Sequence, residues 1–279
     1  MSLNNLIKRA LTGIVFVAVI IGAICWHPFS FLTLFSIITG MILWEFHGLV
    51  KLYENEPVKR LIRCLGGVYL FAATFFYTQG FTGKAIFFPY ILFLLYCLII
   101  ELYNKKSNPI NNWSSTFFAQ VYCAGSFSLL NFIFTETRDI EILPQAPIFV
   151  LAVFIFIWLN DTGAYLIGTL FGKHRLFERI SPKKSWEGFW GGFIVALLTS
   201  QLFYYLVPEI SRFVWAGLAA TVVVFGTWGD LAESLLKRTL NLKDSGNCFP
   251  GHGGMLDRFD SIITAIPVAY IYIEMIIRN

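Results

Sequence analysis

Long apolar segments, separated by short polar stretches, dominate the chain. Nine of them approach or exceed the roughly 20 mostly apolar residues that a transmembrane helix needs. The predicted spans are residues 8–26, 29–50, 61–80, 86–103, 113–134, 147–171, 188–207, 211–236 and 257–277. A buried helix of a soluble protein is the alternative for any single segment, but it does not account for the whole series. We therefore predict an all-α, polytopic integral membrane protein with about nine transmembrane helices.

The distribution of basic residues supports this arrangement and gives it an orientation. Cytoplasmic loops of membrane proteins carry an excess of Lys and Arg. With nine spans, 17 of the 21 Lys and Arg residues fall on the side of the N-terminus. The other four are Lys84, Arg138, Arg212 and Arg278. The N-terminus is therefore predicted to be cytoplasmic and the C-terminus to lie on the far side. We expect the first span to be retained as a helix rather than cleaved as a signal peptide.

Composition narrows the class of protein further. The chain is 57% hydrophobic and 14% charged, whereas soluble domains are about 45–50% apolar. Its partner is thus the lipid bilayer. The net charge of +4 reflects topology and an anion on the inner face, and it does not indicate nucleic-acid binding. The five cysteines contain no C-x-x-C pair, so we predict neither a disulfide framework nor a zinc site.

Polar chemistry is concentrated in the second half of the chain. We predict one membrane domain in two parts, with transmembrane helices and ordinary loops in residues 1–145 and the catalytic half in residues 146–279. Nearly all the unusual polar residues lie between positions 155 and 262. In the first half, Glu45 and His47 near the inner end of the second span are weaker candidates, which could face a site or only reach the interface.

The segment GTWGDLAESLLKRTL, residues 226–240, carries a polar stripe at helical spacing. Its members are Asp230, Glu233, Ser234 and Lys237, with Arg238 beside them. Residues three and four apart share a helix face, so these side chains should project together. The alternative is a helix end that emerges into water and carries charged pairs for solubility.

The segment KDSGNCFPGHGGMLDRFDSI, residues 243–262, follows directly. Its glycines, which include Gly253 and Gly254, allow the backbone to approach a ligand closely. His252 lies among them, and Asp257 and Asp260 flank Arg258 where the next apolar run begins. A helix N-terminus favours one carboxylate, but that preference does not explain this whole group.

Carboxylates beside basic residues are typical of a metal–phosphate site. Mg²⁺ takes oxygen ligands, usually one or two carboxylates together with substrate phosphates. Asp230, Asp257 and Asp260 could hold such a metal. Lys and Arg side chains neutralise phosphate oxygens, and the candidates here are Lys237, Arg238, Lys243 and Arg258. The pattern indicates phosphoryl or nucleotidyl transfer at the cytoplasmic face, with one substrate in the membrane.

Two further stretches have polar residues near apolar spans. Asn160 and Asp161 fall inside a predicted span, where a charge is costly and indicates function. A transport pathway or a polar contact between helices would also explain them. Lys183 and Lys184 follow a Ser-Pro pair at the membrane surface, where a basic pair serves either as a ligand or as a topological anchor.

These motifs together resemble those of the phosphatidate cytidylyltransferases, also called CDP-diacylglycerol synthases. The resemblance is carried by Ser234-x-Leu236-Lys237-Arg238, Lys243-Asp244-x-Gly246 and Pro250-x-His252-Gly253-Gly254-Met255-x-Asp257-Arg258-Phe259-Asp260. The stretches Asn160-Asp161-x-x-Ala164-Tyr165 and Ser181-Pro182-Lys183-Lys184-x-x-Glu187-Gly188 are similar to family motifs as well. The resemblance therefore covers the second half of the chain with specific motifs, whereas for the first half it rests only on length and span number.

The resemblance implies that CTP and phosphatidic acid react to give CDP-diacylglycerol and pyrophosphate, with Mg²⁺. It implies Asp230, Asp257 and Asp260 as metal ligands. Phosphate ligands would be Lys237, Arg238, Lys243, His252 and Arg258, and the other substrate-binding candidates are Asp161, Lys183, Lys184, Ser234, Gly253 and Gly254. It also allows a second, monovalent cation such as K⁺, and a homodimer. The expected location is a bacterial cytoplasmic (inner) membrane.

Three alternatives remain. A transporter would centre on Asn160 and Asp161, but transporters usually have paired halves with sites near the midplane, and here the polar residues gather at one edge. A CDP-alcohol phosphotransferase would carry an Asp-Gly-x-x-Ala-Arg pattern, which this sequence lacks. A scaffold without chemistry would leave the clustered carboxylates and cations unexplained.

Overall fold

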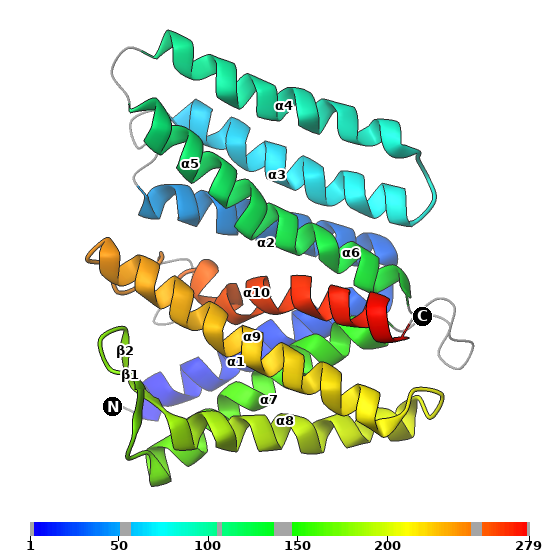
Figure 1. The fold of residues 1–279 in the computed structure, drawn as a ribbon, viewed down its shortest axis with the longest axis vertical. Coiled ribbons are helices and arrows are strands. Elements are labelled where there is room, and N and C mark those ends of the chain that lie inside the picture. The colour runs from blue at the N-terminus through cyan, green and yellow to red at the C-terminus, as the bar shows by residue number, and fades with distance from the viewer. Residues whose placement is uncertain (1–2, 51–56, 105–107, 137–146, 247–252, 278–279) are drawn as a thin grey trace. The chain divides into compact units, whose positions relative to one another are not determined.

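The structure is a computed structural model that describes residues 3–50, 57–104, 108–136, 147–246 and 253–277. The elements in chain order are α1 (Leu3–Trp26), α2 (Pro28–Leu49), α3 (Pro57–Thr78), α4 (Phe88–Ile99), α5 (Pro109–Ala119), α6 (Ser126–Glu136), α7 (Ile148–Phe171), β1 (Arg175–Phe177), β2 (Ser181–Ser185), α8 (Trp186–Leu206), α9 (Arg212–Thr239) and α10 (Leu256–Tyr272). Short 3₁₀ turns flank α4 at Lys84–Phe87 and Ile100–Tyr103, and π-helical turns occupy Gln120–Gly125 and Ile273–Ile277. Figure 1 shows these helices and the β1–β2 hairpin.

Eight helices in the described ranges are long and apolar enough to cross a membrane. They are Pro28–Leu49, Val58–Thr78, Lys84–Tyr103, Pro109–Thr135, Ile148–Phe171, Trp186–Leu206, Arg212–Thr239 and Leu256–Ile276. Each overlaps one of the predicted spans. The remaining prediction, residues 8–26, falls on α1, in which Thr12–Trp26 is an apolar helix among the residues whose side chains are described. An all-α, polytopic membrane fold is thereby confirmed, while the count of nine and the cytoplasmic N-terminus stay predictions.

Polar caps and prolines fix where several helices begin. The Asn108 side chain accepts from the Asn111 amide at 3.3 Å, and Pro109 takes the first helical position of α5. Ser211 caps α9 through the Val214 amide, also at 3.3 Å. The Asn108 and Ser211 side chains satisfy amides that the first helical turn leaves without partners, and Pro109 has no amide hydrogen that would need one.

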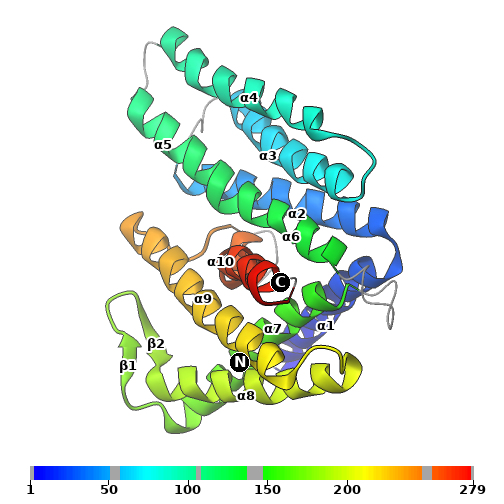
Figure 2. The same cartoon turned by 45° about the vertical axis from the view of Figure 1, so that its right-hand side comes forward.

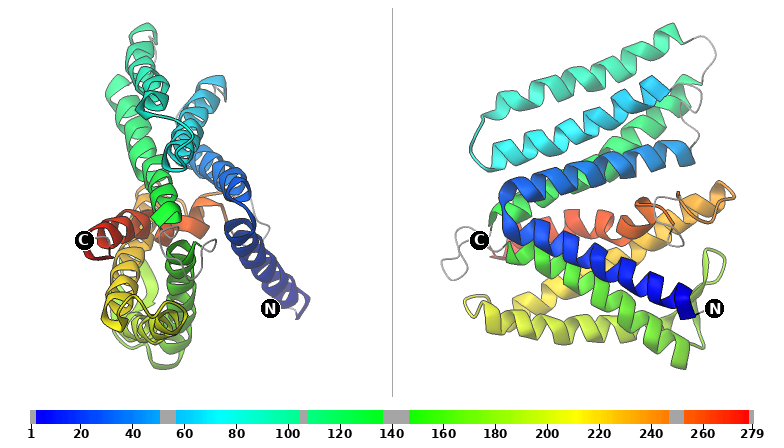
Figure 3. Two further views of the ribbon diagram at one scale, coloured as in Figure 1. Left: turned by 90° about the vertical axis from the view of Figure 1, so that its right-hand side faces the viewer. Right: turned by 180° about the vertical axis from the view of Figure 1, so that it is seen from behind.

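The chain divides into two compact units. The first unit contains α1–α6 and the segment from Asp244 to Arg258 that carries the start of α10. Figure 3 shows α2, α3 and α4 running alongside one another in this unit. Buried phenylalanines form much of its core, and they include Phe31, Phe35, Phe71 and Phe127.

A buried polar network also stabilises the first unit. Arg63 on α3 and Glu101 lie 3.3 Å apart as an ion pair whose side chains are each 1% exposed. Glu101 also accepts from the Asn112 side chain at 2.8 Å, and Arg63 donates to the Thr116 hydroxyl at 3.1 Å. The charges are therefore paired and hydrogen-bonded, as burial requires.

The second unit contains α7, the β1–β2 hairpin, α8, α9 and α10 from Phe259 onward. Figure 2 shows the antiparallel hairpin at one end of α7 and α8. Sequence analysis did not predict this hairpin, which carries Lys183 and Lys184 on β2.

Small residues bring α7 and α8 close together in this unit. A Cβ added at Gly188 would lie 2.8 Å from the Ala164 carbonyl oxygen, and one added at Gly163 would lie 3.1 Å from the Cα of Gly192. Such close backbone approach is how membrane helices associate, because lipid provides no hydrophobic drive.

Candidate functional site

A cleft of about 270 Å³ opens in the second unit among α7, the hairpin, α8 and α9. We call it the hairpin cleft. Its lining includes Asn160, Asp161, Lys183, Lys184, Gly188 and Asp230. Two carboxylates and two ammonium groups thus line one cavity, although they come from three separate stretches of sequence.

Lys184 and Asp230 form an ion pair at the wall of the hairpin cleft. Their side chains are 28% and 27% exposed, so water reaches both. The Ser234 hydroxyl donates to the second oxygen of Asp230 at 3.2 Å, one turn further along α9. Lys183, the neighbour of Lys184, lines the same cleft but is exposed.

Asn160 and Asp161 enter the cleft from α7. The Asn160 amide donates to Asp161 at 3.4 Å, and the Asn160 side chain is buried. Gly192 of α8 lies against Asn160, since an added Cβ there would be 2.5 Å from Asn160 Oδ1. The close packing of α7 and α8 therefore fixes Asn160, and Asp161 beside it faces the cavity.

The rest of the α9 stripe also forms local pairs. Lys237 lies 2.5 Å from Glu233, with side-chain exposures of 11% and 0%. This pair is buried, which contradicts the alternative of a helix end solvated by water. Arg238 is exposed and donates to the Leu242 carbonyl at 3.2 Å and to the Ile180 carbonyl in the hairpin turn at 3.4 Å.

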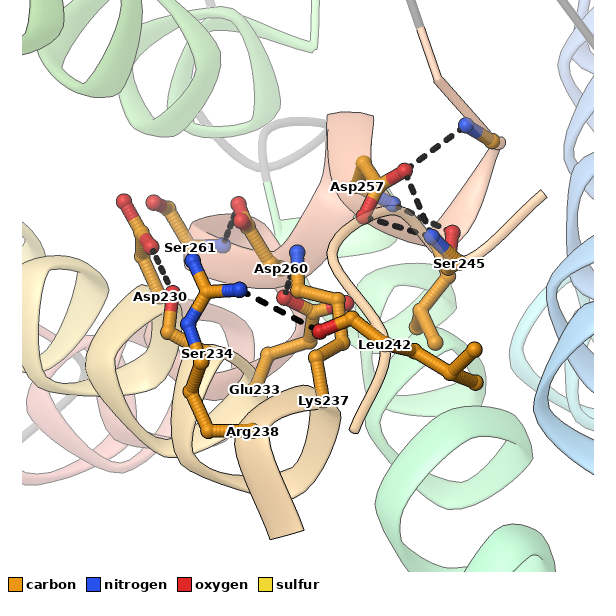
Figure 4. Close-up of polar contacts among 12 residues, drawn as sticks. Asp230, Glu233, Ser234, Lys237, Arg238, Leu242, Ser245, Asp257, Asp260 and Ser261 are labelled. Atoms are coloured by element: carbon orange, nitrogen blue, oxygen red, sulfur yellow. Dashed lines mark hydrogen bonds and ion pairs between the residues drawn. The ribbon is translucent and has the colours of Figure 1, made fainter. Parts of the chain in front are cut away.

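Asp260 on α10 belongs to the same group of carboxylates. A Cβ added at Gly229 would lie 2.9 Å from the Asp260 carbonyl, so α10 passes close to α9 beside Asp230. Figure 4 shows Asp260 beside the α9 stripe. Carboxylates gathered in this way repel one another unless cations lie among them.

Glu187 fixes the hairpin to the start of α8. Its carboxylate accepts from the backbone amides of Lys173 and His174 at 3.2 Å and lies 2.6 Å from His174 Nδ1. Ser185 caps α8 through the Gly188 amide at 3.1 Å. These contacts hold both ends of the segment that presents Lys183 and Lys184.

Asp257 has a different environment, in the first unit. Its two oxygens accept from the Ser245 amide at 2.9 and 3.1 Å and from the Gly254 amide at 2.8 Å. Gly253 between them has φ +81°, a left-handed conformation that favours glycine. Figure 4 shows Asp257 beside Ser245. In this arrangement Asp257 organises the loop before α10.

The predicted residues therefore separate into groups. The hairpin cleft brings together Asp161, Lys183, Lys184 and Asp230, with Ser234 bonded to Asp230. Lys243 and Arg258 are exposed, and His252 lies outside the described residues. Sequence reasoning gave no role to Glu187 or Ser185, whose contacts depend on a hairpin that it did not predict.

Comparison with known proteins places the chain in a family. The model of the cytidylyltransferase family matches residues 7–276. This chain belongs to the cytidylyltransferase family. The match includes every element that lines the hairpin cleft and both polar segments of the second half.

Three proteins that are similar to this chain come from staphylococci. A Staphylococcus epidermidis protein called phosphatidate cytidylyltransferase is 44% identical over 137 residues, which are 48% of this chain and 50% of the relative. A Staphylococcus aureus protein of the same name matches to the same extent. A Staphylococcus haemolyticus protein, also so named, is 45% identical over 122 residues, 43% of this chain and 46% of the relative. The aligned region thus spans about half the length of these curated relatives.

Proposed function

We propose that this chain transfers a cytidylyl group from CTP to phosphatidic acid in a bacterial cytoplasmic membrane. Its products would be CDP-diacylglycerol and pyrophosphate. The observation that carries the proposal is family membership over residues 7–276. The names of the staphylococcal relatives supply the acceptor lipid. The basic residues of the hairpin lie on the side for which charge distribution predicts the cytoplasm, where CTP is available.

The reaction requires groups that neutralise phosphate charge. A phosphate oxygen of phosphatidic acid attacks the α-phosphorus of CTP, a new P–O bond forms, and the bond to the β-phosphate oxygen breaks, so that pyrophosphate leaves. Negative charge repels at the start and develops on the leaving group, so fixed cations lower the barrier. Lys183 and Lys184 in the hairpin cleft are the first candidates, and Lys237, Arg238, Lys243, His252 and Arg258 remain predicted phosphate ligands.

The carboxylates of the cleft fit a magnesium ion in chemistry. Asp161 and Asp230 line one cavity, and Mg²⁺ is usually held by one or two carboxylates plus substrate phosphates and water. When bound, Mg²⁺ would neutralise the transferring phosphate and the pyrophosphate.

We rank the predicted ligands by their partners. Asp230 comes first because it lies in the cleft, and Asp260 second because it lies beside Asp230 and Glu233 of α9 (Figure 4). Asp257 stays a predicted ligand, and its bonds to the Ser245 and Gly254 amides would have to rearrange for it to bind metal. A second, monovalent cation and a homodimer also stay predictions.

The test is transfer of label from [α-³²P]CTP into chloroform-soluble lipid. Purified protein is mixed with phosphatidic acid micelles, with and without Mg²⁺, beside the variants Asp230→Asn and Lys184→Met. Glu209→Gln is the control, since Glu209 is exposed in the turn between α8 and α9. We expect Mg²⁺-dependent labelling that falls about 10²-fold or more in both site variants and stays unchanged in the control. A folded wild-type protein that labels no lipid with any divalent metal would overturn the proposal.

A further inference from the structure

Glu45 on α2 is bonded to the glycine-rich segment although it lies about two hundred positions away in sequence. Its carboxylate accepts from the Met255 and Leu256 amides, each at 2.8 Å, and from the Ser245 hydroxyl at 3.1 Å. All of these residues belong to the first unit. A carboxylate from the N-terminal half of the chain thus binds the segment that carries the family signature.

These contacts place a negative charge at the start of α10. The helix begins at Leu256, so the amides of Met255 and Leu256 are among those that have no partner within the helix. A carboxylate that accepts both is favoured by hydrogen bonding and by the helix dipole. Glu45 therefore caps α10 from another helix.

Two glycines of the segment leave room for this carboxylate. A Cβ added at Gly246 would lie 2.8 Å from Glu45 Oε1 and 2.9 Å from its Cδ, distances that real Cβ atoms essentially never show. At Gly254 it would collide with Glu45 Oε2 and with the Ser245 hydroxyl. Neither position has a positive φ among the described residues, so it is the proximity of Glu45, not backbone conformation, that demands glycine.

Ser245 connects Glu45 to Asp257. Its hydroxyl donates to Glu45 and accepts from the Asp257 amide at 3.3 Å, while its own amide donates to the Asp257 carboxylate at 2.9 Å. The orientation of Asp257 thus depends on a residue that Glu45 holds. Asp257 and Arg258 lie in the first turn of α10, and Asp260 follows one turn later.

We propose that Glu45 is a positioning residue, which fixes the first turn of α10 and thereby the orientation of Asp257 and Arg258 for the reaction. The proposal rests on the proposed function for its catalytic consequence. Its structural part stands apart from that function, because the bonds to Ser245, Met255 and Leu256 can be tested without any substrate.

The first test is hydrogen exchange, read by mass spectrometry, of the variant Glu45→Gln. Glutamine keeps the shape but has no charge and presents an NH₂ group in place of one carboxylate oxygen, so one of the two amides loses its acceptor. We expect amide exchange in residues 253–258 to rise about tenfold or more, with exchange in α3 and α7 unchanged. Glu209→Gln should exchange like the wild type throughout. If residues 253–258 of the Glu45→Gln protein exchange at the wild-type rate, the proposal is overturned. A rise in the exchange rate over the whole first unit would also overturn it.

A second test uses Gly246, for which the three atoms nearest to an added Cβ all belong to Glu45. Gly246→Ala should accelerate exchange in 253–258 in the wild type and in the Glu45→Gln background, because both side chains fill the same space. In the Glu45→Ala background the obstructing atoms are gone, so Gly246→Ala should add less than a twofold change. Equal effects of Gly246→Ala in all three backgrounds would contradict the assigned contact.

A third test measures the activity of Glu45→Gln and distinguishes a failure of this proposal from a failure of the proposed function. Glu45→Gln should lower kcat for lipid labelling about tenfold or more while the KM for CTP changes less than threefold, because the residue orients the reacting groups without touching CTP. Unchanged kcat alongside faster exchange would reject the positioning role. A wild type without activity would instead refute the proposed function, and the two exchange tests would still decide whether Glu45 holds α10.

Discussion

The contact between Gly192 and Asn160 allows a quantitative prediction, since it joins the α7–α8 packing to the hairpin cleft. In Gly192→Ala the new Cβ would lie 2.5 Å from Asn160 Oδ1 and would collide with the Asn160 carbonyl, whereas ordinary contact begins at 3.4 Å. The carbonyl belongs to the helix backbone and cannot rotate away, so the helices must separate by about 1 Å. Such overpacking costs about 1–3 kcal/mol.

The assay is thermal unfolding of purified protein in detergent, followed by size-exclusion fluorescence. For a chain of this size about 2 kcal/mol corresponds to a fall in Tm of about 4–8 °C. Gly191→Ala should also lower Tm, because its Cβ would lie 2.5 Å from the Ile167 Cβ, which no change of rotamer can move. Gly22→Ala is the matched control in open space, with nothing within 4 Å, and should leave Tm equal or slightly higher. Equal Tm values for Gly192→Ala and Gly22→Ala would refute the reasoning.

Two other substitutions follow from the ion pairs. Glu101→Gln leaves the Arg63 guanidinium, whose side chain is 1% exposed, without its opposing charge. The free energy of unfolding should therefore fall by about 3–5 kcal/mol, which would be measured as a lower Tm than that of Glu209→Gln. A Tm equal to that control would contradict the role of the pair. Glu187→Gln weakens the hydrogen bonds that the Lys173 and His174 amides donate to this side chain. Hydrogen exchange in residues 173–185 should therefore accelerate about tenfold, while exchange in α9 stays unchanged. Unchanged exchange in residues 173–185 would show that other contacts hold the hairpin.

The sequence predicted the helices well because the bilayer imposes one length on every span. Runs of about 20 apolar residues have few other structures open to them, and eight such runs became helices of the expected extent. The hairpin escaped prediction for a physical reason. Its strands, Arg175–Phe177 and Ser181–Ser185, are only three and five residues long, and the second is mostly polar. They are too short to show an alternating apolar pattern.

The candidate site shows a similar division between local and distant contacts. Helical geometry fixes the α9 stripe, so the pairing of Glu233 with Lys237 and of Ser234 with Asp230 follows from spacing alone. The partners of Asp230 and of the glycine-rich segment do not, because Lys184 and Glu45 reach them only through tertiary packing. Gly254 illustrates the difference, since sequence reasoning assigned it to a ligand and its nearest neighbours are Glu45 and Ser245.

The Lys184–Asp230 pair joins the two kinds of charge that the proposed reaction needs. An unpaired carboxylate at the edge of a membrane is costly, so each side chain stabilises the other's charge. Both side chains are about a quarter exposed, so water can take the place of either partner. Separating this ion pair should therefore cost little compared with separating a fully buried pair. A polyphosphate with its metal would offer Lys184 an anion and Asp230 a cation at the same time. One ion pair would then become two, and the charges that join the hairpin to α9 would be the ones that bind the substrate.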